Sequence, residues 1–281
     1  MDSAADSPSR RLFSEMVARP DADVDLAEGA LLVACEEYPE LDRGHYLGHL
    51  DLIAARVSDA AAGRRDPDLL MHLVSRELFE EQGFRGNTDE YYDPRNSYLN
   101  EVLDRRKGIP ITLSAVAMAV GARAGLDVAG VGLPGHFVAK AVEAGREVYF
   151  DPFHGGRLLS PDQCAALVKQ VTGLPFVAGG DGLRAVPLGL IVLRMLTNLK
   201  GVYLRGGDFR RAARVIGRLS QLAPGDPLQR RDLGATLLRA GQPGQAIGHL
   251  EAYLAAVPGA EDAGAVRKLL DQARAAVAQW N

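Results

Sequence analysis

Residues 108–125 read GIPITLSAVAMAVGARAG, and this stretch predicts the central element of the fold. Gly108 is expected to end a preceding helix in the left-handed cap position. Pro110 can begin the next helix, because a proline in the first turn sacrifices no intrahelical hydrogen bond. From there to Gly125 the apolar residues lie on nearly every side, which is typical of a helix enclosed by other elements. The stretch therefore predicts a buried helix at the centre of the core.

The chain before this helix is also predicted to be helical. Apolar residues recur at helical spacing over residues 26–82. The segment GFRGNTDEYYDP, residues 83–94, then interrupts the pattern with two glycines and an acidic loop. Asp93 and Pro94 supply an N-cap and a first-turn proline, so a helix of about three turns is expected from there to Lys107.

Beyond Gly125 the period changes to that of extended chain. VAGVGL (128–133), HFVAKAV (136–142) and EVYFD (147–151) predict three antiparallel strands. They are separated by the tripeptide LPG and by a turn near Ala144. A sheet packed on the buried helix is therefore expected.

The glycine-rich stretch GLPFVAGGDGLRAVPLG, residues 173–189, is typical of a connector between domains. We therefore predict a first domain over residues 1–180, with its core at 93–176, and a second over residues 187–281.

The second domain contains an internal repeat, visible when RGGDFRRA is compared with RAGQPGQA. Corresponding residues are 34 positions apart: Gly207 and Gly241, Ala212 and Ala246, and Pro224 and Pro258. This period, with a small residue, an alanine and a closing proline, is the signature of the tetratricopeptide helix-turn-helix. About two repeats and one further helix are expected.

Composition excludes several classes of protein. The 281 residues are 47% hydrophobic and 24% charged, which is typical of a globular protein. A net charge of -4, without a basic block, argues against a nucleic-acid partner. The longest uncharged stretch, residues 109–122, has 14 residues and is too short for a membrane span, which needs roughly 18. No membrane association is predicted.

The cysteines and histidines do not indicate a cofactor. Cys35 and Cys164 form no CxxC pair, and both lie in helical patterns typical of buried, inert thiols, so a reducing cytoplasm fits best. His45 and His49 are one helical turn apart, a spacing that can hold zinc, but no third ligand is apparent. With no phosphate-binding glycine loop either, we predict neither a metal nor a cofactor.

His136 and Asp151 are the strongest candidates for chemistry. In a hairpin turning near Ala144 they lie opposite each other within a residue or two, and so project from the same face. A carboxylate beside an imidazole fixes the tautomer of the ring, which is the orienting half of a nucleophilic triad. The other half would be a nucleophile at the start of a helix, where a thiol is activated. Pro110 stands in that place.

At this point the chain resembles a known family. NSYLNEVLDRRKGIPITLS (96–114), VGLPGHF (131–137), DPFHGG (151–156) and the helical repeats resemble the bacterial SirB family, from roughly Leu47 onward. The resemblance implies the α+β class: a papain/transglutaminase-like domain with a helical N-terminal region, followed by an all-α tetratricopeptide-like domain.

The resemblance also defines what is missing. Catalytic transglutaminase-like domains are similar to residues 108–125 in a pattern of glycine, any residue and cysteine, and the cysteine step falls on Pro110. Histidine and aspartate carry over to His136 and Asp151. Proline cannot attack a carbonyl, so standard acyl-enzyme chemistry is excluded at that position.

Five further residues are candidates for the cleft, each with a structural alternative. Thr112 and Ser114 could replace the nucleophile, although hydroxyls bonded to their own helix or a neighbouring loop are favoured. Asn96 and Asn100, four residues apart, would face the same way and either bind an anion or, as favoured, clamp the neighbouring loop. His154 lines the cleft or remains a solvated loop histidine.

These observations favour recognition over catalysis. We predict a degenerate transglutaminase-like domain whose cleft binds a protein or peptide, with the repeats extending the contact surface and a regulatory or scaffolding role. The alternative is a hydrolase or acyltransferase that uses His136 and Asp151 with water or an unconventional nucleophile. A third hypothesis is a purely structural module.

Overall fold

The computed structural model describes residues 8–19, 24–143 and 146–279. By packing, the chain divides between Met195 and Leu196 into two compact units, and each is described by itself. This division comes later in the chain than the glycine-rich connector.

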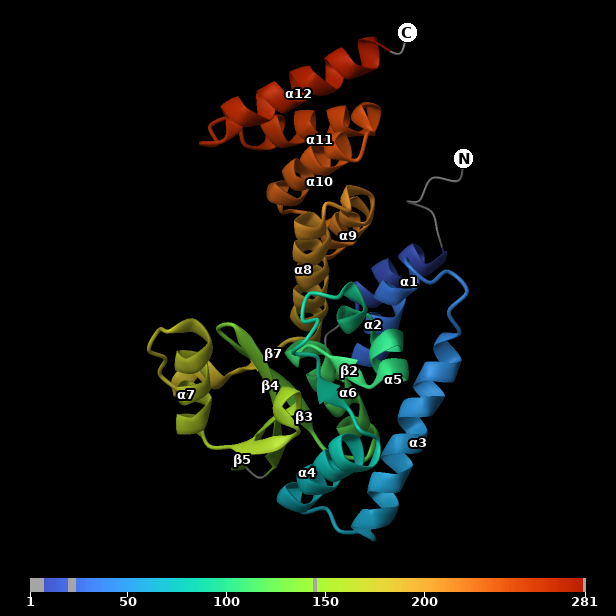
Figure 1. The fold of residues 1–281 in the computed structure, drawn as a ribbon, viewed down its shortest axis with the longest axis vertical. Helices are drawn as coiled ribbons and strands as arrows, with labels where there is room; N and C mark the ends of the chain where they lie inside the picture. Colours follow the sequence, from blue (N-terminus) through green and yellow to red (C-terminus); the bar gives the residue numbers. More distant parts are fainter. Residues whose placement is uncertain (1–7, 20–23, 144–145, 280–281) are drawn as a thin grey trace. The chain divides into compact units, whose positions relative to one another are not determined.

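The first unit combines helices with a five-stranded sheet (Figure 1). Its helices and helical turns are α1 (Pro8–Val17), α2 (Leu26–Ala34), α3 (Arg43–Ala61), α4 (Pro67–Ser75), η3 (Arg76–Glu81), η4 (Pro94–Ser97), α5 (Leu99–Arg105), α6 (Pro110–Arg123), η5 (Pro152–His154), α7 (Pro161–Thr172) and η6 (Gly180–Leu183). Its strands are β1 (Arg85–Gly86), β2 (Lys107–Gly108), β3 (Val128–Leu133), β4 (His136–Glu143), β5 (Arg146–Asp151), β6 (Arg157–Leu159) and β7 (Ala185–Val186). The helix α8 (Leu188–Gly206) contains the boundary between the units.

The helix α6 is the centre of the first unit, as the sequence predicts. Pro110 is its first residue, and every residue from Pro110 to Gly121 is buried. The helices α2, α3, α4 and α5 pack against it, and β3 and β4 pack on its remaining side. The apolar character on all sides of this segment is therefore explained by enclosure.

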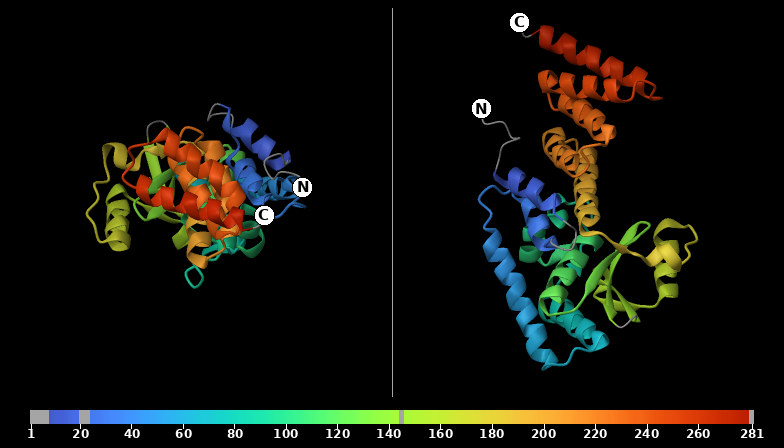
Figure 2. Two further views of the ribbon diagram at one scale, coloured as in Figure 1. Left: turned by 90° about the horizontal axis from the view of Figure 1, so that it is seen from above. Right: turned by 180° about the vertical axis from the view of Figure 1, so that it is seen from behind.

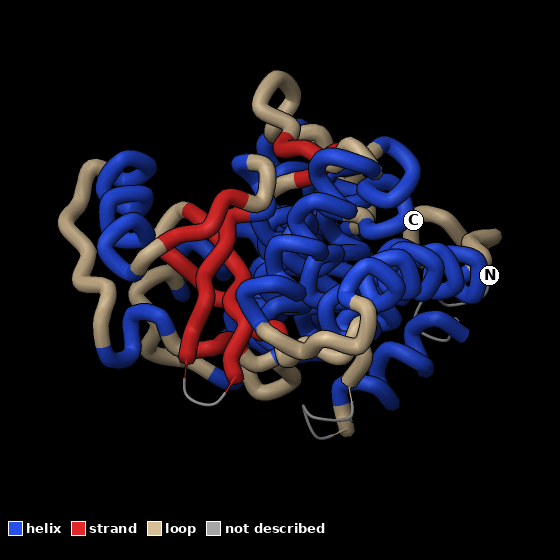
Figure 3. Tube along the Cα trace, turned by 90° about the horizontal axis from the view of Figure 1, so that it is seen from below, coloured by secondary structure: helices blue, strands red, loops and turns tan. Residues whose placement is uncertain are grey.

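The main sheet has the order β6-β5-β4-β3-β7, and all its neighbours are antiparallel. The three predicted strands are confirmed, whereas the short edge strands β6 and β7 were not predicted. On one face Val131, Val138 and Tyr149 form a core with Cys164 and Leu167 of α7. The sheet therefore lies between α6 and α7, as the front and back views show (Figures 1 and 2). The view from below shows the strands of the main sheet running side by side (Figure 3). The turn near Ala144 lies outside the described residues.

The helix expected from Asp93 to Lys107 is not continuous, and that prediction was wrong. A short 3-10 turn, η4, ends at Ser97, and α5 begins only at Leu99. Between them Tyr98 is extended, with φ of -95° and ψ of 123°, and its ring packs edge-on against Tyr38 at 5.5 Å. The backbone leaves the helical conformation at Tyr98, where this ring packs, and the helical sequence pattern does not indicate the break.

The second unit consists of helices, and its repeat is visible in the backbone. Besides the end of α8, it contains α9 (Phe209–Leu222), α10 (Pro227–Arg239), α11 (Pro243–Ala256) and α12 (Ala263–Ala278). Gly207 and Gly241 have nearly the same left-handed φ, 74° and 75°. Ala212 and Ala246 are both fully buried. Residues 34 positions apart thus have the same backbone conformation or the same burial, as the tetratricopeptide pattern predicts.

No helix in the described part of the chain combines the length and the apolar character that crossing a membrane requires.

Candidate functional site

His136 is placed by a tight turn between β3 and β4. Leu133 pairs with His136 across the turn, and Gly135 between them has a φ of 72°. Pro134 followed by a glycine of positive φ is the arrangement that a type II turn requires. The Arg194 guanidinium donates to the carbonyl oxygens of Leu133 at 3.2 Å and of His136 at 2.8 Å. The backbone that carries the imidazole is therefore held at both ends of the turn.

Asp151 ends β5 and begins the DPFHGG segment. Its Oδ1 accepts a hydrogen bond from the backbone N–H of Phe153 at 3.2 Å, which caps the turn η5. Gly156 has a φ of 72°, and a Cβ atom there would overlap the Ser75 hydroxyl. That hydroxyl donates to the Gly156 carbonyl at 3.0 Å. The absence of a side chain at Gly156 therefore lets this segment dock closely against the end of α4.

The register of the hairpin brings the two candidate residues together. Phe150 pairs with Ala139, so Asp151 would follow opposite Val138, two residues from His136. A displacement of two residues keeps both side chains on one face as diagonal neighbours. His136 Nε2 lies 3.0 Å from Asp151 Oδ1. The contact that the sequence predicts between these side chains is present.

Asp151 is shared between two imidazoles. Its Oδ2 lies 2.6 Å from His154 Nδ1 and 3.6 Å from the Arg157 guanidinium. Asp151 is fully buried and His136 is 4% exposed. Burial raises the pKa of Asp151. The hydrogen bonds and the charges of His136 and His154 lower it by more, so the pKa of Asp151 is below its usual value. The carboxyl group is therefore held in its ionised form.

The carboxylate determines which ring nitrogen of His136 carries the proton. An ionised carboxylate only accepts hydrogen bonds, so Nε2 carries the proton that faces Asp151. In the neutral ring Nδ1 is then an acceptor. Among the residues that the structure describes, no side chain is hydrogen-bonded to Nδ1. The imidazole is oriented as a base or acceptor without a protein partner on its second nitrogen.

Aromatic rings surround this imidazole. Phe153 packs edge-on against His136 at 5.9 Å and against Tyr91 at 6.0 Å, between ring centroids. The His154 ring is tilted by 30° to that of His136 at 5.5 Å. His136, Asp151, Phe153 and His154 thus form one group of contacting side chains, here named the His136 cluster. The His154 side chain remains 41% exposed. Tyr91 comes from the loop that precedes η4.

Neither thiol is a partner of His136. Pro110 is buried at the first position of α6. Cys164 is fully buried, and burial together with the charge of Asp151 raises its pKa to about 11. Cys35 lies at the end of α2. A high pKa keeps Cys164 protonated and unreactive at neutral pH, in line with the inert thiol expected there.

Asn96 and Thr112 form a clamp on the loop before η4. Asn96 Nδ2 donates to the Glu90 carbonyl at 2.7 Å, and Asn96 Oδ1 accepts from Asn87 Nδ2 at 2.9 Å. The Thr112 hydroxyl donates to the Asn96 carbonyl at 2.7 Å and accepts from the Ile109 N–H at 3.1 Å. The favoured alternatives for these two residues, a loop clamp and a backbone-bonded hydroxyl, agree with these contacts.

Asn100 and Ser114 differ from the expectation. Asn96 belongs to η4 and Asn100 to α5, and the break at Tyr98 means that the two amides do not share one helix face. Asn100 instead lines a separate pocket. Ser114 is fully buried, and its hydroxyl has no hydrogen-bond partner within the described residues, contrary to the bonding expected for it.

One group of metal-ligating side chains exists in the described part of the chain. The ligand-type atoms of His136, Asp151 and His154 all lie within 4.8 Å of one another. Two histidines and a carboxylate are a donor set that metal sites use. The Arg157 guanidinium beside the carboxylate opposes a further cation there. His49, which has metal-binding spacing with His45 in the sequence, does not belong to this group. Burial and the charge of Arg106 lower the pKa of His49.

The residues that sequence reasoning missed are Arg194 and Phe153. Arg194 follows the glycine-rich connector and was assigned to the repeat domain, so no local pattern linked it to His136. Phe153 lies inside the DPFHGG motif, but it is not among the residues that the sequence predicts for the site. Its aromatic character beside an orienting aspartate was the available signal.

The geometry defines a class of protein: a transglutaminase-like domain, with a helix packed on an antiparallel sheet that carries histidine and aspartate, followed by tetratricopeptide helices. Comparison with known families agrees. Residues 44–197 match the model described as transglutaminase-like superfamily, and residues 199–271 match the tetratricopeptide repeat. The chain therefore belongs to the transglutaminase-like superfamily. The narrower SirB assignment remains a prediction.

Similar proteins cover most of the chain. The UPF0162 protein of Xylella fastidiosa strain Temecula1 is 33% identical over 91% of this chain and 92% of its own length. The UPF0162 protein of Vibrio cholerae is 29% identical over 75% of this chain and 78% of its own length. F-box only protein 21 of Homo sapiens is 30% identical over 33% of this chain and 16% of its own length. No solved structure matches.

Proposed function

We propose that this protein is a non-catalytic member of the superfamily that recognises a protein or peptide through the cleft at His136, in a regulatory or scaffolding role. The observation that carries the proposal is the second ring nitrogen of His136: Asp151 holds Nε2, which leaves Nδ1 as an acceptor, and no thiol or hydroxyl of the described residues is hydrogen-bonded to it. Such an imidazole can accept a hydrogen bond from a ligand N–H, for example a peptide amide.

Three further features support recognition. Pro110, which has no nucleophilic group, begins the helix whose start carries the cysteine in catalytic relatives. Phe153 and Tyr91 provide aromatic surface beside His136, which suits peptide side chains. The repeat match over residues 199–271 supports a protein-binding role, because such arrays present extended contact surfaces.

A second function, hydrolysis or acyl transfer, is favoured by one observation. The His136 and Asp151 pair retains the geometry of a base and its orienting carboxylate, with 3.0 Å between Nε2 and Oδ1. In that case Nδ1 removes a proton from water as the water attacks a carbonyl, and the protonated ring then donates to the leaving group.

Peptide selection separates the two functions. The full chain is used to select peptides from a displayed library, and each selected peptide is tested with wild type and His136→Ala by fluorescence polarisation. His72→Ala is the matched control, because His72 is an exposed histidine on α4. We expect His136→Ala to weaken binding by about tenfold, as for a lost hydrogen bond with its packing, and His72→Ala to leave it unchanged.

Mass spectrometry of the same peptides after long incubation completes the test. Recognition predicts peptides that are bound and recovered intact. A product that forms with wild type and disappears with His136→Ala would establish the enzyme instead. Binding that is insensitive to His136→Ala would reject this cleft as the recognition site.

A further inference from the structure

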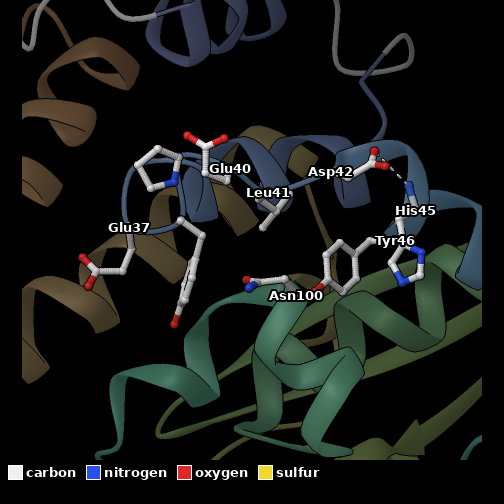
Figure 4. Close-up of a pocket in the computed structure, with 9 residues that line it drawn as sticks. Glu37, Glu40, Leu41, Asp42, His45, Tyr46 and Asn100 are labelled. Atoms are coloured by element: carbon white, nitrogen blue, oxygen red, sulfur yellow. Dashed lines mark hydrogen bonds between the residues drawn. The ribbon is translucent and has the colours of Figure 1, made fainter.

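A pocket lies between the loop at residues 37–42, the start of α3 and the first turn of α5 (Figure 4). Its volume of about 520 Å³ is within the range of ligand sites, about 300–1,000 Å³. None of its lining residues belongs to the His136 cluster. It is therefore a separate site.

The pocket is acidic. Glu37, Glu40 and Asp42 line it, and its lining includes no lysine or arginine from the described part of the chain. The Tyr46 hydroxyl donates to a further carboxylate, Asp104, at 2.8 Å. Burial and that hydrogen bond raise the pKa of Tyr46 to about 12, so the phenol stays neutral. The charge of the pocket favours a cationic ligand.

An unpartnered amide points into this acidic pocket. Asn100 is 4% exposed, and its Oδ1 is buried without a hydrogen-bond partner in the described part of the chain. Figure 4 shows its side chain extending from α5 into the pocket beside Tyr46. A buried carbonyl oxygen without a donor costs free energy, which a ligand N–H would recover. A ligand that supplies a donor to this oxygen, together with the positive charge that the carboxylates favour, would therefore be stabilised here.

Aromatic rings narrow the chemistry of that donor. Tyr38 and Tyr46 also line the pocket. A guanidinium is planar, carries five N–H donors and stacks on aromatic faces, whereas an ammonium is a compact, strongly hydrated charge. Of the two basic side chains, arginine thus satisfies the amide, the carboxylates and the rings together.

We propose that this pocket binds the guanidinium group of an arginine side chain presented by a protein partner. The guanidinium donates to Asn100 Oδ1, lies against the tyrosine rings, and is surrounded by the carboxylates of the loop. Glu40 and Asp42 are exposed, so a partner backbone can approach them. The proposal shares a protein partner with the function proposed above, but it stands on different residues and is tested without His136.

Peptide binding to the full chain tests the proposal. The probe is a blocked pentapeptide with a central arginine, compared with the same peptide carrying citrulline, which has nearly the same shape without the charge. Binding is followed by NMR chemical-shift changes up to millimolar concentration. We expect the citrulline peptide to bind at least about tenfold more weakly, because hydrogen bonds to a charged group are the stronger ones.

Variants locate the binding. Asn100→Leu should weaken the arginine peptide by about tenfold while leaving the protein equally or more stable, because it removes an unpaired buried oxygen. Glu40→Gln should weaken it about two- to fivefold, with a smaller salt dependence than wild type. Glu81→Gln, at an exposed glutamate of η3, is the matched control and should bind like wild type.

Each outcome decides the proposal. Equal affinity for the arginine and citrulline peptides, or no shift of pocket residues at millimolar peptide, overturns it. If Asn100→Leu unfolds the protein, the exposed Glu40→Gln variant still gives the answer. If agmatine, a free guanidinium compound, binds and the blocked peptide does not, the ligand is a small metabolite and the protein partner is rejected.

Discussion

Replacing Asp151 by asparagine tests whether the His136 cluster is a cooperative polar network. The substitution keeps the shape of the side chain and removes its charge. Asn Oδ1 can still accept from His136 Nε2 and from the Phe153 N–H, which lie at 3.0 Å and 3.2 Å in the wild type. The atom that changes is Oδ2, which accepts from His154 Nδ1 at 2.6 Å and faces Arg157.

The magnitude follows from that one lost acceptor. A hydrogen bond to a charged group is worth about 1.5–3 kcal/mol. The new amide also directs a donor at His154, but that side chain is 41% exposed and can turn to water. We therefore expect Asp151→Asn to lower the free energy of unfolding by about 2 kcal/mol at neutral pH.

The assay is urea unfolding followed by circular dichroism as a function of pH. The pKa of Asp151 is lower in the folded protein than its ordinary value, so its charge stabilises the fold above the unfolded pKa of about 3.9. This contribution is lost as the pH falls through the folded pKa. The difference between wild type and Asp151→Asn should therefore be largest near neutrality and shrink below about pH 4.

The control is Asp181→Asn, because Asp181 is 84% exposed in its ion pair with Arg184. It should change stability by less than about 0.5 kcal/mol. If Asp151→Asn behaves like this control at neutral pH, or if its deficit persists unchanged in acid, the network does not stabilise the fold in the way described.

Three other substitutions test the surroundings of the site and the repeat unit, each by the midpoint of urea unfolding. Gly156→Ala should lower the free energy of unfolding by about 2–4 kcal/mol, because strain at positive φ adds to a clash with Ser75. Gly155→Ala is the control, since a Cβ there meets open space, and it should lower the free energy of unfolding by only about 1–2 kcal/mol. Equal losses would contradict the close docking. Arg194→Met should lower the free energy of unfolding by about 2 kcal/mol and speed amide hydrogen exchange at the β3–β4 turn, because it removes two hydrogen bonds to the backbone of the turn. Unchanged exchange would show that these hydrogen bonds do not stabilise the turn. Leu250→Ala should destabilise the repeat unit by about 2–5 kcal/mol, because Leu250 is fully buried, and a smaller loss would mean that its core is loosely packed.

Elements with a strong local signal were predictable from the sequence. Pro110 begins α6 because a proline favours the first turn, and the strands around His136 and Asp151 follow a two-residue period. The contact between those two side chains follows from hairpin symmetry alone.

Features that depend on distant packing were not predictable. The break at Tyr98 coincides with a ring contact to Tyr38, 60 residues earlier in the numbering, which no local pattern contains. The edge strands β6 and β7 have three and two residues, too few to show a period. Arg194 reaches His136 across 58 positions, so only the folded chain brings them together.

The proline at position 110, where helix α6 begins, has a consequence for redox sensitivity. Reactive cysteines are lost to hydrogen peroxide and to electrophiles because their thiolates are nucleophilic. The two thiols of this chain are Cys35, at the end of α2, and Cys164, which is buried and whose pKa is raised to about 11. The peptide binding proposed for the His136 cluster should therefore persist under oxidising conditions and after treatment of the protein with alkylating reagents.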